Sequence, residues 1–275
     1  MKILLIIGLF FTTTLAMAET IDLRFIVQPH LNDRAKMAKM VGQLNDYFIN
    51  SQVNLQARLV DVTPLRVEEN DPVKIVHAMF NQEGVFAGLQ QHNRQVGADY
   101  TFMLTDKILH KGKAICGRAY AVNKTLAEIA DSRRALAVIH PVCGGHTLAH
   151  ELGHLMGLNH GALVDRCQPK HGHATALTPY ANGFGEGNCD GKPQEGEFGD
   201  IMVGGWMGQV MGNDKASLPF FSNAKLRDPR CGESGVCGDP ATGDAARVLN
   251  EHAHIYANHE QLPSTDGKPA LQIEK

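Results

Sequence analysis

The sequence predicts a single α/β domain with a twisted mixed sheet of about five strands, followed by an irregular, disulfide-stapled region that ends in a helix. Two observations support this fold class. Between residues 19 and 160, stretches with alternating apolar residues are separated by stretches with helical spacing. Between residues 161 and 240, glycine, cysteine and proline are frequent and the periodicity is lost, which is typical of long functional loops.

The first expected elements are a strand, a helix, a second strand and a second helix. Apolar residues alternate at 21–27 and again at 53–59, as in half-buried strands. Between these strands, Asn32 is a candidate cap for the first helix. The second helix opens at Asp71-Pro72 and breaks near Gly84. The apolar face of the first helix consists of Met37, Met40, Val41, Leu44 and Phe48.

Three more strands are expected at 99–104, 117–122 and 135–140. The last of these leads through "GGH" into a helix that lies beneath the sheet. After the irregular region, a closing amphipathic helix is expected from the apolar spacing of Val248, Leu249, His252, Ile255 and Tyr256.

Composition and charge bound the class of protein. The 275 residues carry a net charge of −3 and contain no basic run, which argues against a nucleic-acid partner. The apolar fraction of 43% can support a sizeable core. We expect one domain over residues 19–275, with an upper part at about 19–160 and a lower part at about 161–275.

Residues 1–18 have the pattern of a secretory signal peptide. Lys2 precedes an apolar stretch, and Ala16-Met17-Ala18 provides a small-residue cleavage site before Glu19. The alternative, an uncleaved anchor, is disfavoured because the apolar run is short for a membrane span. The sequence therefore predicts export, either to the extracellular space or to the periplasm of a Gram-negative bacterium, with no membrane span in the mature protein.

The segment "HTLAHELGHLMGLNH" at 146–160 contains the candidate metal ligands. His150 and His154 lie one helical turn apart and face the same side. His146 is eight residues from His154, a rise of roughly 12 Å, so these rings cannot share one ion with bonds of about 2.0–2.1 Å. Gly157 can end the helix, and the chain then returns with His160. The predicted ligands are His150, His154 and His160, holding one catalytic Zn²⁺.

Glu151 is the candidate catalytic residue. It follows the first ligand, projects about 100° away from it on the helix, and would lie beside the metal. That position suits a general base acting on a zinc-activated water. The alternative is a buried helix with incidental histidines, and the added Gly157 and His160 disfavour it.

The pattern His150-Glu151-x-x-His154-x-x-Gly157-x-x-His160 resembles the signature of the metzincin zinc endopeptidases. "PFFSN" at 219–223, the cysteine pair after it and "GDAARVLNEHAHIYANH" at 243–259 are similar to the end of the adamalysin/reprolysin-like members, particularly the bacterial ones. The resemblance covers nearly all of the chain after the leader. It implies a metzincin-like fold, with helices above an active-site cleft.

The resemblance also implies further site residues. Met202 in "GDIMVGG" matches the structural methionine turn of this clan. A substrate would pair with an edge strand near Gly117, Arg118 and Ala119, and Trp206 is a candidate pocket residue with packing as the equal alternative. The chain departs from adamalysins at Gly161, where they usually carry Asp, and from astacins at Gly204, where they carry a tyrosine.

Six cysteines in an exported chain favour disulfides. Six cysteines allow 15 pairings. The favoured set is Cys116–Cys143 near the motif helix, Cys167–Cys189 after the third ligand and Cys231–Cys237 across a short turn. A second zinc site is disfavoured because no C-x-x-C spacing occurs.

The function that the motif and the resemblance imply is secreted zinc-dependent endopeptidase activity on proteins or peptides, by a monomer. Two alternatives remain open. One is a zinc amidase or deacylase acting on small molecules, which would need a closed pocket. The other is an inactive zinc-scaffold binding protein, which the intact Glu151 disfavours.

Overall fold

A five-stranded sheet is the frame of the protein. The computed structural model describes residues 18–168, 176–206 and 216–259. The strand order is β2-β1-β3-β7-β6; the first four strands run parallel, and β6 pairs antiparallel with β7 at one edge. The prediction of a mixed sheet of five strands is confirmed. The strands of this sheet are β1 Glu19–Val27, β2 Leu55–Pro64, β3 Tyr100–Leu104, β6 Gly117–Ala119 and β7 Leu136–Ile139.

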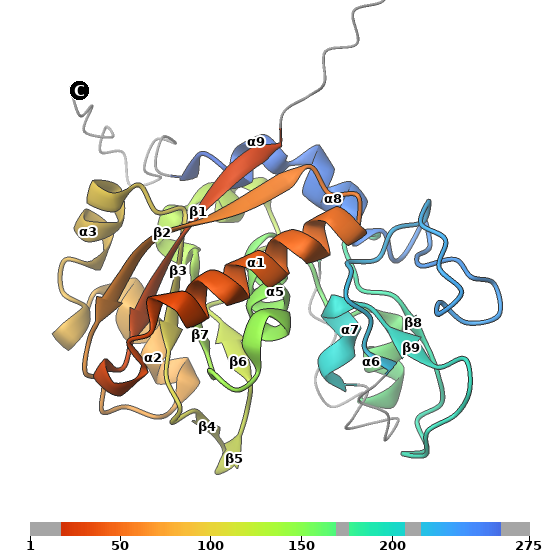
Figure 1. Cartoon of the computed structure of the whole chain (residues 1–275), viewed down its shortest axis with the longest axis horizontal. Coiled ribbons are helices and arrows are strands. Elements are labelled where there is room, and N and C mark those ends of the chain that lie inside the picture. Colours follow the sequence, from red (N-terminus) through yellow and green to blue (C-terminus); the bar gives the residue numbers. More distant parts are fainter. Residues whose placement is uncertain (1–17, 169–175, 207–215, 260–275) are drawn as a thin grey trace, which may run out of the picture.

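Helices cover both faces of the sheet (Figure 1). Apart from the short 3₁₀ turns, the helices before residue 160 are α1 Arg34–Asn50, α2 Pro72–Asn81, α3 Leu89–Val96, α4 Leu126–Ala130 and α5 Gly144–Leu155. Helices α1 and α5 pack on one face, where Phe25 and Phe102 lie in a cluster with Leu44 and Leu152. Helix α2 packs on the other, where Ile26 belongs to a second cluster. Burial on both faces explains the apolar character of the strands.

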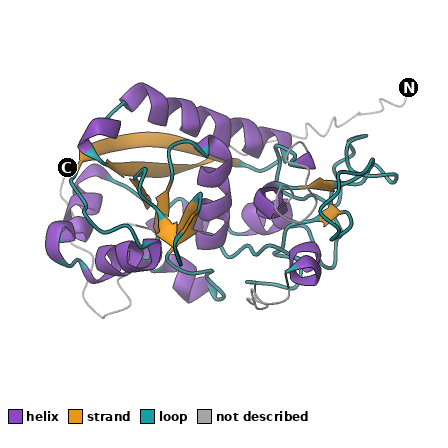
Figure 2. Cartoon of the chain, turned by 90° about the horizontal axis from the view of Figure 1, so that it is seen from below, coloured by secondary structure: helices purple, strands orange, loops and turns teal. Residues whose placement is uncertain are grey.

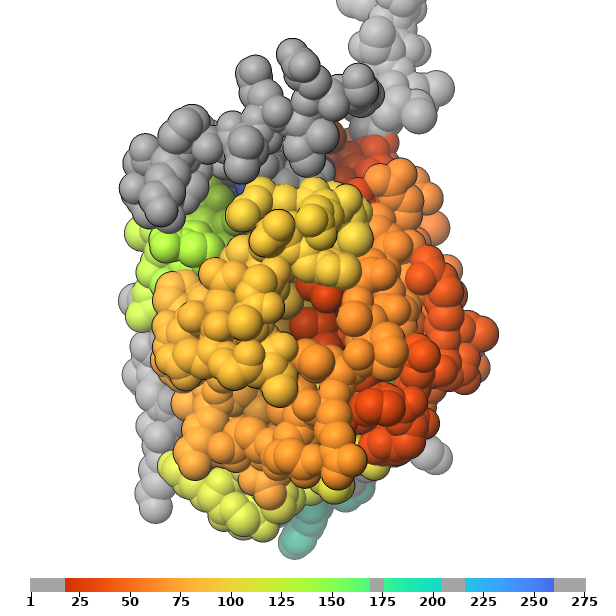
Figure 3. Space-filling view, turned by 90° about the vertical axis from the view of Figure 1, so that its left-hand side faces the viewer, coloured from red at the N-terminus to blue at the C-terminus, as the bar shows by residue number. Residues whose placement is uncertain are grey.

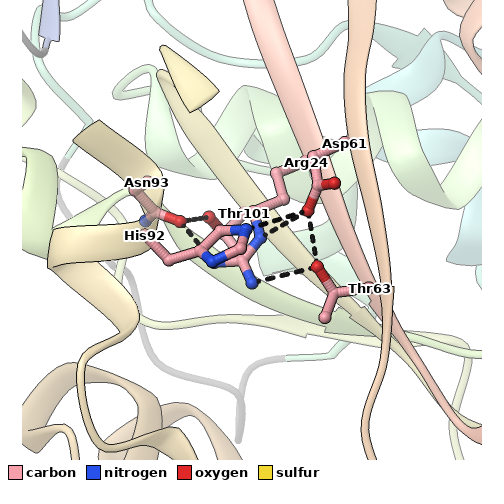
Figure 4. A network of polar contacts seen from close by, with 6 residues as sticks. All are labelled: Arg24, Asp61, Thr63, His92, Asn93 and Thr101. Carbon is pink, nitrogen blue, oxygen red and sulfur yellow. Dashed lines mark hydrogen bonds and ion pairs between the residues drawn. The ribbon is translucent and has the colours of Figure 1, made fainter. Parts of the chain in front are cut away.

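The second face also carries a buried polar network (Figure 4). The Arg24 guanidinium on β1 donates to Asp61 Oδ2 at 3.1 Å, to Asn93 Oδ1 at 2.8 Å and to Thr63 Oγ1 at 3.2 Å. Thr101 on β3 donates to the same Asn93 oxygen at 3.0 Å. These bonds tie three strands to α3. Figure 3 shows this side of the molecule, hollowed at its centre between the orange and yellow rims.

After residue 160 the described chain contains little regular structure, as the composition predicts. Figure 2 shows that loops dominate this part. Its two small apolar clusters are separate from the main core. The short elements are α6 Ala162–Cys167, β8 Gly185–Glu186, β9 Phe198–Gly199 and α7 Ile201–Trp206, and the hairpin β4 Leu109–His110 with β5 Lys113–Ala114 belongs to the earlier part of the chain.

Three expectations need correction. The cap of α1 is Asp33, whose side chain accepts from the Lys36 N–H at 3.1 Å, one residue after the predicted Asn32. The closing helix is broken near His252 into α8 Ala245–Glu251 and α9 Ala253–Tyr256. These helices join the main core rather than the lower region, and the Tyr256 hydroxyl donates to Met156 O at 2.9 Å. Within the described residues, no helix is long and apolar enough to cross a membrane.

Candidate metal centre

Helix α5 carries the first two predicted ligands. It begins shortly after β7 and buries Leu148, Leu152 and Leu155 in the main core. This apolar face fixes the rotation of the helix about its own axis. His150 and His154 consequently point together toward the segment that follows the helix.

The chain reverses at Gly157, as the sequence predicts. Its φ of +90° lies in a region that side chains disfavour. The Leu158 N–H donates back to Gly153 O at 2.8 Å, which is the bonding pattern of a helix C-terminus. Leu158 O then accepts a hydrogen bond from His154 Nδ1 at 2.9 Å. Two residues later the reversed chain reaches His160.

The three predicted ligand side chains converge. His160 Nε2 lies 3.1 Å from His154 Nε2 and 3.2 Å from His150 Nε2. Among the described residues, these histidines form the group able to hold a metal ion. Tetrahedral zinc with bonds of about 2.0–2.1 Å requires nitrogens roughly 3.3 Å apart, so the spacing fits this ion.

The tautomers also fit a metal. His150 Nδ1 contacts Ile201 O at 2.9 Å, and His154 Nδ1 contacts Leu158 O. A carbonyl oxygen only accepts, so each Nδ1 carries the proton and each Nε2 keeps its lone pair. Backbone carbonyls commonly orient zinc-binding histidines in this way. Burial lowers the pKa of His154 to about 3 and also lowers the pKa of His150, which keeps both rings in the neutral, ligating form.

Glu151 lies beside this group and is buried. Its Oε2 accepts a hydrogen bond from the Ala119 N–H on β6 at 2.6 Å. Burial raises the pKa of Glu151 to about 8, and the Ala119 N–H and Arg118 oppose the rise. A dication held by the neighbouring imidazoles would also oppose this rise and lower the pKa of Glu151, because a positive charge favours the carboxylate form.

Met202 lies in α7, fully buried beneath the helix that carries the ligands. A Cβ built on Gly153 of α5 would lie 2.5 Å from Met202 Sδ, so a residue without a side chain makes room for the sulfur. The preceding Asp200 fixes the turn, since its carboxyl accepts from the Val203 N–H at 3.1 Å and the Ser222 N–H at 2.8 Å. Ile201 O, between them, orients His150.

The geometry explains the departure at Gly161. Its φ is +90°, and a Cβ there would collide with Gly183 O. The Asp that adamalysins carry after the third histidine cannot be accommodated by this backbone. A glycine is required because the chain after His160 passes directly over the segment at residues 182–183, where Gly183 N donates to Asn159 O.

The three disulfides have the pairings that the sequence favours: Cys116–Cys143, Cys167–Cys189 and Cys231–Cys237. The first joins the residue before β6 to the residue before α5. The second closes the chain after the third ligand.

The remaining predicted residues have different surroundings. Gly117 and Ala119 lie on the edge strand next to Glu151, whereas the Arg118 side chain is exposed. Trp206 ends α7, but its side chain is outside the described part of the structure. His146 is outside the ligand group; its ring contacts the edge of Tyr47 at 6.4 Å between centroids and Ser217 Oγ at 3.4 Å.

Two parts of the site escaped the sequence reasoning. Asp200 precedes the turn methionine and, with Val203 three residues later, has the spacing of a helix cap, which is a signal that could have identified it. The bond from Ala119 to Glu151 joins residues 32 apart. Such a contact has no local signature.

Comparisons with known proteins point to a metallopeptidase. A family model described as Metallo-peptidase family M12 matches residues 12–192, which contain all three histidines and Glu151. A peptidyl-Asp metalloendopeptidase of Pseudomonas aeruginosa is 25% identical over an alignment of 268 residues, and the alignment covers 91% of this chain and 42% of that protein. The chain therefore spans less than half the length of this curated relative.

Solved structures are similar as well. A structure described as a chaperone–substrate complex has a TM-score of 0.61 and 18% identity, over 88% of this chain and 35% of that chain, so the fold is shared. Metalloproteinase-II from Bacteroides fragilis has a TM-score of 0.37 and 15% identity, over 52% and 44% of the two chains. Because the family match extends over more than half of its residues, this chain belongs to metallopeptidase family M12.

Proposed function

We propose that this chain is an exported zinc endopeptidase that hydrolyses peptide bonds in protein substrates. The observation that carries the proposal is the convergence of three imidazole Nε2 atoms, with two separations of 3.1 and 3.2 Å, beside a buried glutamate. The similarity to a metalloendopeptidase supports the reaction class. Three disulfides support export, because they persist in oxidising compartments.

Each side chain has a distinct role in this mechanism. His150, His154 and His160 would hold the ion. Zinc held there would supply a Lewis acid and would lower the pKa of a water molecule. Glu151 accepts the proton of the attacking water and then donates it to the leaving amine. Met202 packs under the ligands and takes no part in proton transfer.

The free edge of β6 is the proposed substrate-binding strand. His140 N donates to Cys116 O, and Tyr120 N donates to Leu136 O, so these two residues of the β6 segment bond toward β7. In an antiparallel pair the alternate residues, Gly117 and Ala119, direct their backbone groups away from the partner. Because the Ala119 N–H donates to Glu151, the groups proposed to pair with the substrate are the Gly117 backbone and the Ala119 carbonyl. An extended polypeptide can add to such an edge as a further strand. This feature favours a protein substrate over a small amide.

An acidic side chain next to the scissile bond is the proposed preference. The similar bacterial enzyme is described as a peptidyl-Asp endopeptidase. Here Arg118 is exposed on β6 and close enough to lower the pKa of Glu151 by its charge. A guanidinium binds carboxylates through charge-assisted hydrogen bonds. Matched peptides that differ only by Asp or Asn test the preference, and Arg118→Gln should remove the discrimination while leaving the Asn peptide unaffected.

The activity is tested on a denatured protein substrate with the purified protein, with chelator, and with chelator followed by zinc. Internal cleavage that the chelator abolishes and zinc restores is the expected result. Zinc-dependent hydrolysis of the acyl bond of small acylated molecules, without cleavage of protein, would instead identify an amidase or deacylase. One bound zinc per chain with neither reaction would indicate a binding protein.

A further inference from the structure

The β6 backbone contacts the proposed general base directly. The Ala119 N–H donates to Glu151 Oε2 at 2.6 Å, and both groups are buried. Because this N–H points away from β7, the bond takes nothing from the sheet ladder. One carboxyl oxygen of Glu151 is thereby held by a rigid backbone group.

Gly117 determines where the other carboxyl oxygen lies. A Cβ built at this residue would lie 2.6 Å from Glu151 Oε1, 2.8 Å from Glu151 Cγ and 2.8 Å from Thr147 Cγ2. Distances below 3.0 Å require displacement. Thr147 is buried one turn before Glu151 on α5 and cannot readily yield. The Glu151 side chain would therefore move if residue 117 had any side chain.

The Cys116–Cys143 disulfide joins the two elements that make these contacts. Cys116 immediately precedes β6, and Cys143 immediately precedes α5. His140 N also donates to Cys116 O at 2.7 Å. The strand is only three residues long, so it has few other bonds to maintain its distance from the helix.

We propose that β6 is the positioning element for Glu151. The Ala119 N–H and the absent side chain of Gly117 set the place of the carboxyl group, and the Cys116–Cys143 bond keeps the strand there. This inference rests on the general-base role of Glu151 proposed above and assigns that role its structural support. Since the Gly117 backbone and the Ala119 carbonyl of the same strand are the groups proposed to pair with the substrate, this strand would align the scissile bond with the base.

Gly117→Ala tests the steric part, with Gly42→Ala as the matched control. Gly42 is exposed in α1, and a Cβ there meets nothing within 4 Å. A displacement of the base by about 1 Å can lower the rate about 100-fold, so kcat of Gly117→Ala should fall on that order. KM should stay within about threefold and zinc at one per chain, because neither substrate pairing nor ligation uses the new methyl group. An unchanged kcat in folded Gly117→Ala would overturn the proposal.

Amide hydrogen exchange tests the contact without an activity measurement. In the zinc-loaded protein, the Ala119 N–H should exchange at least about tenfold faster in Gly117→Ala and in Glu151→Ala than in the wild type. The Tyr120 N–H, which donates to Leu136 O on β7 at 2.8 Å, is the internal reference and should be unaffected. If Gly117→Ala fails to fold, Glu151→Ala still decides: undiminished protection of Ala119 would refute the contact.

Cys116→Ala/Cys143→Ala tests the disulfide, and Cys231→Ala/Cys237→Ala is the control pair. The first variant should retain zinc, lose at least about tenfold in kcat and expose the Ala119 N–H to exchange; the second should retain kcat. Equal activity and equal Ala119 protection in the two variants would show that the disulfide does not support β6. A wild type without any peptidase activity would refute the proposed function, whereas the exchange measurements would still report on the contact.

Discussion

At the scale of single residues, variants of Glu151 and His160 can separate the proposed proton transfer from the proposed metal binding. The Glu151 carboxyl bonds to Ala119 and lies outside the ligand group, whereas His160 Nε2 contacts both other ligand nitrogens. A change at Glu151 should lower the rate of peptide hydrolysis, and a change at His160 should lower the zinc content.

Glu151→Ala should keep one zinc per chain while losing several decades of turnover, since it removes the proton acceptor alone. His160→Ala should bind zinc much more weakly because two imidazoles remain. His146→Ala is the control and should keep both zinc and fold. Metal analysis and peptidase rates on the three variants check this. Near wild-type cleavage by Glu151→Ala would exclude the mechanism.

Asp200 is a second residue with a testable consequence. Burial raises its pKa to about 6, against the hydrogen bonds from Ser222, Val203 and its other neighbours, compared with about 3.9 for an unperturbed Asp. Because the folded pKa is the higher one, the stability that this group contributes is complete below about pH 4 and is lost as the pH rises through 6. Asp200 therefore contributes less to the free energy of unfolding at neutral pH than at pH 4.

Even when it is protonated, the Asp200 carboxyl keeps a lone pair on each oxygen for its two N–H donors, whereas the amide of Asp200→Asn has only one acceptor oxygen. Asp200→Asn should lower the free energy of unfolding by about 1–3 kcal/mol at pH 4, the cost of an unsatisfied buried group. The difference from wild type should narrow between pH 4 and pH 7, since only the wild type loses the contribution of the carboxyl. Urea unfolding of both metal-free proteins from pH 4 to pH 7 measures this difference in the free energy of unfolding. A difference that widened with rising pH would contradict a raised pKa for Asp200.

The convergence of His150, His154 and His160 beside Glu151 could be predicted from sequence because helical spacing and the glycine at 157 constrain these residues locally. Met202 could be predicted only from the resemblance to the metzincins, because it lies 42 residues after His160 and no local spacing connects the two. The roles of Gly117 and Asp200 could not be predicted in this way. They depend on atoms from distant segments, such as the Ser222 N–H that reaches Asp200.

Secondary elements with strong periodicity were predicted closely. Helix α1 runs to Asn50 with the expected five buried residues, Met37, Met40, Val41, Leu44 and Phe48. β2 continues to Pro64, beyond the alternation that ends at Leu59, because it pairs with β1 along its whole length. The break near His252 was missed, since the apolar spacing of residues 248–256 continues across it. Pairing and local breaks are tertiary effects that periodicity does not record.

Met202 connects two elements, α7 and the ligand helix α5, through its contact with Gly153. Met202→Leu conserves most of the volume of the side chain and should cost less than about 1.5 kcal/mol of stability. Zinc content should stay at one per chain and much of the activity should remain, because a thioether here fills space and does not ligate. Thermal unfolding, metal content and rate can be measured on one preparation. Loss of zinc from folded Met202→Leu would show that the sulfur has another role.

In the whole molecule the proposed metal site lies where the main core meets the irregular region. Helix α5 belongs to the main core, whereas the chain after His160 enters the region held by Cys167–Cys189. Helices α8 and α9 return to the core beside β1, so the chain leaves and rejoins it. An ion bound by His150, His154 and His160 would therefore link helix α5 to the beginning of the irregular region at His160.

Removal of the metal should accordingly lower the stability of the whole fold. A ligand that binds only the native state at about 1,000 times its Kd stabilises it by roughly 4 kcal/mol, and each kcal/mol shifts the Tm of a protein near this size by about 2–4 °C. Chelation should then lower the Tm by on the order of 10 °C, and added zinc should restore it. Calorimetry of wild type, His160→Ala and His146→Ala checks the linkage. The chelator should shift the Tm of His146→Ala as it shifts the wild type, but should leave that of His160→Ala unchanged. An unshifted wild-type Tm after proven zinc loss would mean that the metal serves the reaction without joining the two parts of the fold.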